Sequence, residues 1–233
     1  MSSEINIPVN RETILSGQIH ELIRRQDNTA KLLSESERLL SLNSMFNHEK
    51  IKEDVWLFGY GSLIWNPAIE YLEKQPMLVC GFHRKFCLKT YLGRGSKNCP
   101  GLMLALDKGG SCKGLGYRIS SKKAAKELEI IWSREMAMNS YIPRWLSARI
   151  GERKLKVLGF VVNRKLDRYV GKLEDQKTAE FIYRAEGFLG KCSEYLYNTA
   201  EQLEYHGLKD KYLYRIRDIV HKLELQNDRE ALS

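Results

Sequence analysis

The stretch Val-Trp-Leu-Phe-Gly-Tyr-Gly-Ser-Leu-Ile-Trp, residues 55–65, joins a short apolar run to a turn with two glycines. The run predicts a strand over residues 55–59. Gly59 and Gly61 flank Tyr60, and such a turn can point successive backbone N–H groups into one concavity that holds a carboxylate or an oxyanion. An ordinary strand end with a tight turn produces the same pattern, so both interpretations stay open at this point.

Further short strands follow this turn. Apolar or alternating segments at 77–81, 83–89, 102–107 and 115–119 are separated by Gly, Pro, Asn and Ser, which is typical of a curved sheet or small barrel. Arg84 interrupts an otherwise apolar face in the second of them.

The rest of the chain is mostly helical in pattern. A helix is expected from Ser121 to about Tyr141, a strand at 155–163, and then three helices. Those three helices are expected at 175–186, 191–206 and 209–224. Strands first and helices later favour the α+β class over an alternating βαβ fold.

Residues 1–50 read as a separate helical segment. Leu15, Ile19 and Leu22 recur at helical spacing, and Ser34 with Glu37 fits a capping box. We therefore expect a helical N-terminal extension over residues 1–50 and one domain over residues 51–233.

Composition and charge narrow the range of possible functions. The 233 residues are 43% hydrophobic and 29% charged, which suits a globular protein with a real core and excludes intrinsic disorder. The net charge is +9, and residues 51–150 alone carry +8, so an anion is expected there, either a small acidic substrate or a nucleic acid. No run of about 20 apolar residues predicts a membrane span, and the first residues lack the basic and apolar blocks of a signal peptide.

Cysteine and histidine usage points away from disulfides and metals. The five cysteines, at 80, 87, 99, 112 and 192, form no CxxC pair and indicate the reduced thiols of a cytoplasmic protein. The five histidines are far apart, so no metal site is expected. Neither a phosphate-binding GxxxxGK loop nor a GxSxG hydrolase turn is present.

Glu135 is the strongest single candidate for chemistry. On a helical wheel it is the one carboxylate in an apolar stripe, whereas Glu127 and Arg134 fall on the opposite side. The stripe comprises Leu128, Ile131 and Trp132. Burial would raise the pKa of Glu135 towards the range of a general base. A structural glutamate paired with a buried cation or a backbone group is the open alternative.

Two further side chains are weaker candidates. Tyr141, six residues after Glu135, could donate a hydrogen bond into the same cavity, although a packed core tyrosine explains it equally well. Arg94 in a glycine-containing loop could face an anion, and a solvated arginine is the alternative.

Three blocks in this order resemble the ChaC family of γ-glutamylcyclotransferases. They are VWLFGYGSLIWNPAIEY at 55–71, GFHRKFCLKTYLGRGSKNCPGLMLALDKGGSCKGLGYRI at 81–119 and IIWSREMAMNSYIPRW at 130–145. The resemblance extends from about Trp56 to Val220 and leaves residues 1–50 outside. RGS at 94–96 and GLGYR at 114–118 depart conservatively from the RGT and GVAYR of many members.

The resemblance implies a γ-glutamylcyclotransferase-like mixed β-barrel with flanking helices, which makes residues 51–233 the catalytic domain. It implies cleavage of glutathione to 5-oxoproline and Cys-Gly without a cofactor. Glu135 then corresponds to the general base, and the turn with Tyr141 corresponds to the substrate-binding residues. The turn residues are Phe58, Gly59, Tyr60, Gly61, Ser62 and Leu63.

This reaction is consistent with the residues themselves. The α-amine of the γ-glutamyl group is the nucleophile, so no Ser or Cys nucleophile is needed, and the two carboxylates of glutathione suit the basic middle third. The expected partner is therefore a small molecule, with no nucleic acid and no membrane, and the sequence does not indicate an oligomeric state.

Three alternatives remain at this point. One is a cyclotransferase for other γ-glutamyl dipeptides or amines. The second is a basic nucleic-acid-binding module. Two observations argue against it: the basic residues are spread over several loops, and no recognised nucleic-acid-binding motif is present. The third is an interaction protein that acts through the N-terminal extension.

Overall fold

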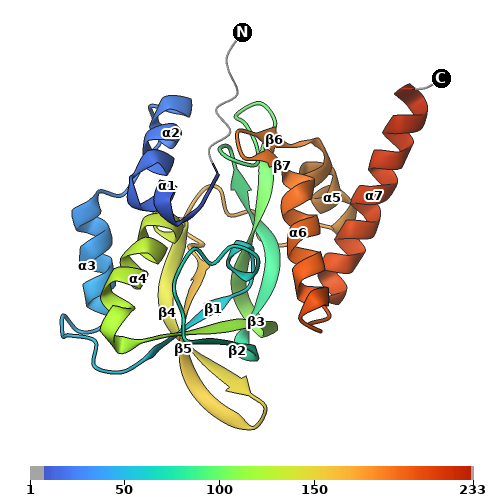
Figure 1. Cartoon of the computed structure of the whole chain (residues 1–233). Coiled ribbons are helices and arrows are strands. Elements are labelled where there is room, and N and C mark those ends of the chain that lie inside the picture. Colours follow the sequence, from blue (N-terminus) through green and yellow to red (C-terminus); the bar gives the residue numbers. More distant parts are fainter. Residues whose placement is uncertain (1–7, 232–233) are drawn as a thin grey trace. The chain divides into compact units, whose positions relative to one another are not determined.

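Five strands form a closed barrel in the order β1-β3-β2-β4-β5, and helices accompany them (Figure 1). The strands are β1 Val55–Gly59, β2 Glu73–Thr90, β3 Gly101–Ile119, β4 Tyr141–Ile150 and β5 Arg153–Val162. The computed structural model describes residues 8–231. Within that range, contacts divide the chain into one unit of residues 8–84 with 105–166 and another of residues 85–104 with 167–231.

The strand pairing makes the barrel mixed. β1 runs antiparallel to β3, from Val55 opposite Ile119 to Gly59 opposite Leu115. β4 and β5 form an antiparallel hairpin, whereas β1 pairs with β5 in parallel at Leu57. The predicted α+β class with a mixed barrel is therefore confirmed.

The strands are longer than expected. β2 contains both segments predicted at 77–81 and 83–89, and β3 contains those at 102–107 and 115–119. Gly81 takes a φ of +83° inside β2, and Gly109 and Gly110 take +100° and +68° inside β3. Glycine tolerates this conformation, so each strand bends where the pattern suggested a break and then continues.

The helix over Glu135 ends earlier than predicted. α4 spans Ser121–Glu135, and Asn139 follows with a φ of +51°. The chain reverses there and enters β4 at Tyr141, a strand that the sequence pattern did not predict. The expected helix up to about Tyr141 was therefore wrong over its last residues, 136–141.

The first unit also contains the N-terminal helices α1 Arg11–Leu15, α2 Gln18–Gln26 and α3 Glu35–Met45. Gly17, with a φ of +74°, separates α1 from α2. Ser34 and Glu37 form the predicted capping box at the start of α3. Both α1 and α3 pack against α4, beside which they lie in Figure 1.

The second unit is built from three helices and the ends of β2 and β3. The helices α5 Asp175–Arg184, α6 Cys192–Tyr205 and α7 Lys211–Ala231 correspond to the three predicted C-terminal helices. A short hairpin of β6 Glu186–Gly187 and β7 Gly190–Lys191 precedes α6. No helix within residues 8–231 is long and apolar enough to span a membrane.

The apolar stripe of α4 is buried as the helical wheel predicts. Leu128, Ile131 and Trp132 are at most 1% exposed, and the Trp132 ring meets the Phe160 ring of β5 edge-on at 5.2 Å. This packing anchors α4 to the barrel and fixes the position of its last residue. Glu127 lies outside the stripe and is nevertheless only 1% exposed.

Candidate active site

The turn after β1 is shaped by close packing around Gly59. A Cβ at this position would lie 3.1 Å from the Tyr117 ring and 3.2 Å from the Cβ of Leu63. The chain then forms a short 3-10 helix, η1 Ser62–Ile64, in which the Ile64 N–H donates to the Gly61 carbonyl at 2.9 Å. Gly59 therefore lets the strand end directly against the turn.

Buried tyrosines hold the turn on its inner side. The Tyr60 hydroxyl donates to the Phe160 carbonyl at 2.8 Å, and the Tyr117 hydroxyl donates to the Leu63 carbonyl at the same distance. Burial raises the pKa of Tyr117, which keeps its hydroxyl protonated as a donor. Sequence reasoning did not identify Tyr117, because its partner lies 54 residues away along the chain.

Arg84 supports the same turn from β2. Its side chain is buried, its Nε donates to the Tyr60 carbonyl at 2.5 Å, and its NH2 donates to the Lys113 carbonyl at 2.7 Å. The sequence marked Arg84 only as an interruption of an apolar face. That interruption was the available signal, since a buried arginine requires acceptors.

The backbone N–H groups of the turn differ from its carbonyls, which accept hydrogen bonds. Among residues 8–231, no hydrogen bond engages the backbone N–H groups of Gly61, Ser62 and Leu63. The side chains of Phe58, Tyr60 and Leu63 are buried at 0%, 6% and 4% exposure. Packing of these three residues therefore fixes the shape of the turn.

Glu135 ends α4 with its side chain 13% exposed. Burial raises the pKa of its carboxyl group, and the positive charge of Arg134 opposes that rise. The Arg134 Nε lies 3.2 Å from the Glu135 Oε1. The result is a largely buried carboxylate next to one guanidinium.

Arg134 connects this carboxylate to the turn. Its NH2 donates to the Ser62 Oγ at 2.7 Å and its NH1 donates to the Asn66 carbonyl. The structure thus brings Glu135 and the turn together through one side chain. The helical wheel placed Arg134 on the opposite face, and the reach of a long side chain in the last helical turn explains why it still contacts Glu135.

Tyr141 is the first residue of β4, opposite Val162 of β5, and is half-buried. Its predicted place at a helix end was wrong, because the chain turns at Asn139. Asn163 stabilises this connection, since its side-chain amide donates to the Asn139 carbonyl at 3.2 Å and its backbone N–H to the Ser140 carbonyl at 3.0 Å.

Arg94 belongs to the second unit. There its NH1 donates to the Lys191 carbonyl at 2.8 Å and pairs with the Glu194 Oε2 at 2.5 Å. The structure therefore pairs this candidate anion contact with a carboxylate of its own unit. Within residues 8–231, no group of three or more His, Cys, Asp or Glu side chains is arranged to hold a metal ion.

The model of the family described as ChaC-like protein matches residues 55–223. The chain belongs to the ChaC-like protein family. The resemblance predicted from about Trp56 to Val220 is confirmed, and both the turn and Glu135 lie inside the matched region of the ChaC-like chain.

Curated relatives of this ChaC-like chain include enzymes. It is 34% identical over 197 residues to the glutathione-specific γ-glutamylcyclotransferase of Escherichia coli K12, which covers 84% of this chain and 85% of that protein. It is 29% identical over 173 residues to human glutathione-specific γ-glutamylcyclotransferase 1, covering 71% and 78%.

Solved structures support the fold. A crystal structure of a γ-glutamylcyclotransferase specific to glutathione from yeast superimposes with a TM-score of 0.67. It covers 73% of the ChaC-like chain and 97% of the yeast chain, at 21% identity. The predicted γ-glutamylcyclotransferase-like fold is confirmed.

Proposed function

We propose that this ChaC-like chain is a glutathione-specific γ-glutamylcyclotransferase, an enzyme that releases 5-oxoproline and Cys-Gly from glutathione. The names of its curated relatives support this activity. The observation that carries it is one arrangement of groups. The largely buried carboxylate of Glu135 is connected through Arg134 to a turn whose amides at residues 61–63 make no hydrogen bond within residues 8–231.

Glu135 is proposed as the general base. The α-ammonium group of glutathione loses one proton to this carboxylate, and the resulting amine attacks the γ-carbonyl carbon to form the C–N bond of a five-membered ring. The ring nitrogen releases its second proton to solvent. The bond between the γ-carbon and the cysteine nitrogen then breaks, and protonated Glu135 returns its proton to that leaving nitrogen. A raised pKa suits both transfers, and the balance requires neither a nucleophilic side chain nor a cofactor.

The turn is proposed to bind the γ-glutamyl group. The amides of Gly61, Ser62 and Leu63 can donate to the α-carboxylate or to the oxyanion that develops on the γ-carbonyl oxygen. Gly59, Tyr60 and Phe58 belong to the same site by shaping the backbone. The turn folds the glutamyl chain into the attacking conformer, so ring closure benefits from proximity.

Further proposals accompany this site. Tyr141 is proposed as a donor towards the substrate, and Arg94 as a contact for an anion.

Residues 51–233 are proposed as the catalytic domain with residues 1–50 as an extension, which the family match at residues 55–223 supports. Cytoplasmic location is proposed because all five cysteines are free thiols, as expected in a reducing compartment.

The direct test is incubation of the purified full chain with reduced glutathione. We expect equal amounts of 5-oxoproline and Cys-Gly by mass spectrometry, and a much lower kcat/KM with γ-Glu-Ala. Comparable values for the two substrates would favour the broader γ-glutamyl alternative. Absence of both products from glutathione would contradict the proposed function.

Replacing Arg134 with methionine should move the acidic limb of the kcat–pH profile to higher pH. The positive charge of Arg134 lowers the pKa of Glu135, so its removal leaves the effect of burial unopposed. A general base is active when deprotonated, and activity is lost as pH falls through its pKa. A higher pKa therefore shifts that loss upwards.

The matched control for this variant is Arg144→Met, because Arg144 is exposed on β4. Its profile should coincide with that of the wild type. An acidic limb that stays in place or moves to lower pH in Arg134→Met would refute the electrostatic role given to Arg134.

A further inference from the structure

We infer that residues 8–45, here called the arm, position the catalytic centre, and that Arg11 and Glu127 are positioning residues for Glu135. This inference rests on the proposed function. The arm contains α1, α2 and α3 and lies outside the matched family region. Three sets of contacts connect the arm to α4 and to the segment that follows the substrate-binding turn.

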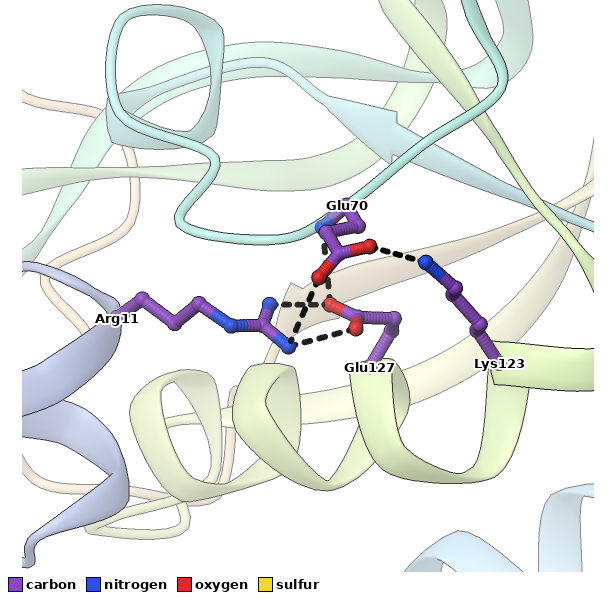
Figure 2. A network of polar contacts seen from close by, with 4 residues as sticks. All are labelled: Arg11, Glu70, Lys123 and Glu127. Carbon is purple, nitrogen blue, oxygen red and sulfur yellow. Dashed lines mark hydrogen bonds and ion pairs between the residues drawn. The ribbon is translucent and has the colours of Figure 1, made fainter.

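The first set is centred on a buried carboxylate (Figure 2). Glu127 of α4 is 1% exposed, and both of its oxygens accept hydrogen bonds from the Arg11 guanidinium. The NH1–Oε2 distance is 2.5 Å and the NH2–Oε1 distance is 2.7 Å. Such a paired geometry fixes direction as well as distance, so α1 and α4 are held in one register.

The same carboxylate also holds the segment after the turn. The backbone N–H of Glu70 donates to the Glu127 Oε2 at 2.9 Å. The side chain of Glu70 pairs with Lys123 at 2.5 Å and lies 3.8 Å from the Arg11 NH2 (Figure 2). Two cations thus balance two carboxylates, and removal of Arg11 leaves buried Glu127 without its guanidinium.

The second set involves Asn66, which follows the turn by three residues. The side-chain amide of Asn66 donates to the Val9 carbonyl of the arm. The Asn66 carbonyl accepts from Arg134, which also contacts Ser62 and Glu135. A continuous path of contacts therefore leads from the arm to the proposed base.

The third set meets the end of α4. The His20 Nε2 lies 2.7 Å from the Ser133 carbonyl, and the Leu33 N–H donates to the Ala137 carbonyl at 2.9 Å. The last carbonyls of a helix have no partner within the helix. The arm supplies partners to carbonyls on both sides of Glu135, so it constrains the backbone that carries the base.

These contacts predict that the arm affects the rate of turnover. Glu127 lies eight residues before Glu135 on the same helix, and Glu70 and Asn66 lie on the segment that leaves the turn. When Arg11 is lost, the buried charge drives α4 and this segment to rearrange, because an unpaired buried carboxylate is strongly unfavourable. Glu135 then shifts relative to the turn, and a shift of about 1 Å can lower a rate substantially.

The first experiment measures kcat and KM for glutathione in Arg11→Gln, at a temperature where circular dichroism shows the folded state. We expect kcat to fall by about tenfold or more with KM changed less than threefold. The matched control is Arg25→Gln, which breaks the exposed Arg25–Glu21 pair of α2 in the same arm and should keep the wild-type kcat. A wild-type kcat in Arg11→Gln, with only a lower melting temperature, would overturn the inference.

A second variant addresses the case in which Arg11→Gln does not fold. The double variant Arg11→Gln/Glu127→Gln removes both charges and leaves two amides able to hydrogen-bond. We expect it to fold and to have a kcat below that of the wild type. A folded double variant with the wild-type kcat and wild-type pH profile would overturn the inference, because positioning would then not depend on the charged pair.

Amide hydrogen exchange separates this inference from the proposed function. Without substrate, exchange at residues 62–70 and 133–137 should be faster in Arg11→Gln than in Arg25→Gln or the wild type. Unchanged exchange at these residues would overturn the positioning role. A wild-type protein that does not cleave glutathione would contradict the proposed function, while the exchange result would still report on the arm.

Discussion

Glu135→Gln is expected to lower kcat for glutathione by roughly 10²–10⁴-fold, the usual contribution of a general acid–base group. Glutamine has nearly the same shape but cannot accept the proton of the attacking amine. The hydrogen bonds of Arg134 to Ser62 and Asn66 do not involve the Glu135 carboxylate, so the turn should stay in place. KM should therefore change much less than kcat.

The same variant should be more stable than the wild type at neutral pH. Burial raises the pKa of Glu135 in the folded state, so folding favours its protonated form. In the wild type, the stability that protonated Glu135 contributes is then lost as pH rises through the raised pKa. A neutral amide has no such loss. Thermal melts at pH 5 and pH 8 should show a smaller decrease in melting temperature for Glu135→Gln.

The control for both measurements is Glu129→Gln, because Glu129 is exposed on the same helix. It should leave kcat and the pH dependence of melting unchanged. If Glu135→Gln keeps kcat within tenfold of the wild type, another group must be the base. If it melts like the wild type at both pH values, Glu135 is not held with a raised pKa.

The parts of the site that local sequence determines could be predicted. The apolar period of α4 identified Glu135, since a carboxylate within a buried stripe is visible from its spacing to the apolar residues of the same helix. The strand ending at Gly59 followed from an apolar run and two glycines. The capping box of Ser34 and Glu37 followed from a spacing of three residues. Each of these depends on residues close together in the chain.

The parts that depend on distant residues could not be predicted. Glu127 appeared as a polar-face residue because its partner, Arg11, lies 116 residues away. Tyr141 was assigned to a helix because its strand is defined by pairing with β5, not by an alternating pattern of its own. The length of β2 was missed because Gly81 bends the strand without ending it.

Arg84→Met is expected to give the second largest effect, on both stability and substrate binding. The buried guanidinium donates to the Tyr60 and Lys113 carbonyls, and methionine fills similar volume without a donor. Hydrogen bonds from a charged group contribute about 1.5–3 kcal/mol each, so the loss of two should lower the free energy of unfolding by roughly 3–6 kcal/mol. Urea unfolding would measure this loss.

Arg84→Met should weaken substrate binding because Arg84 fixes the Tyr60 carbonyl within the turn. When the Tyr60 carbonyl loses this donor, the turn can rotate and move the amides of Gly61 and Ser62 away from the positions in which they are proposed to bind the substrate. KM for glutathione should therefore rise at least tenfold at a temperature where the variant is folded. Arg84→Lys keeps a charge but not the fork that reaches both carbonyls, so its KM should be intermediate.

The exposed Arg149 of β4 supplies the control, Arg149→Met, which should have wild-type stability and a wild-type KM. A destabilised Arg84→Met with an unchanged KM would show that Arg84 supports the barrel but does not orient the turn.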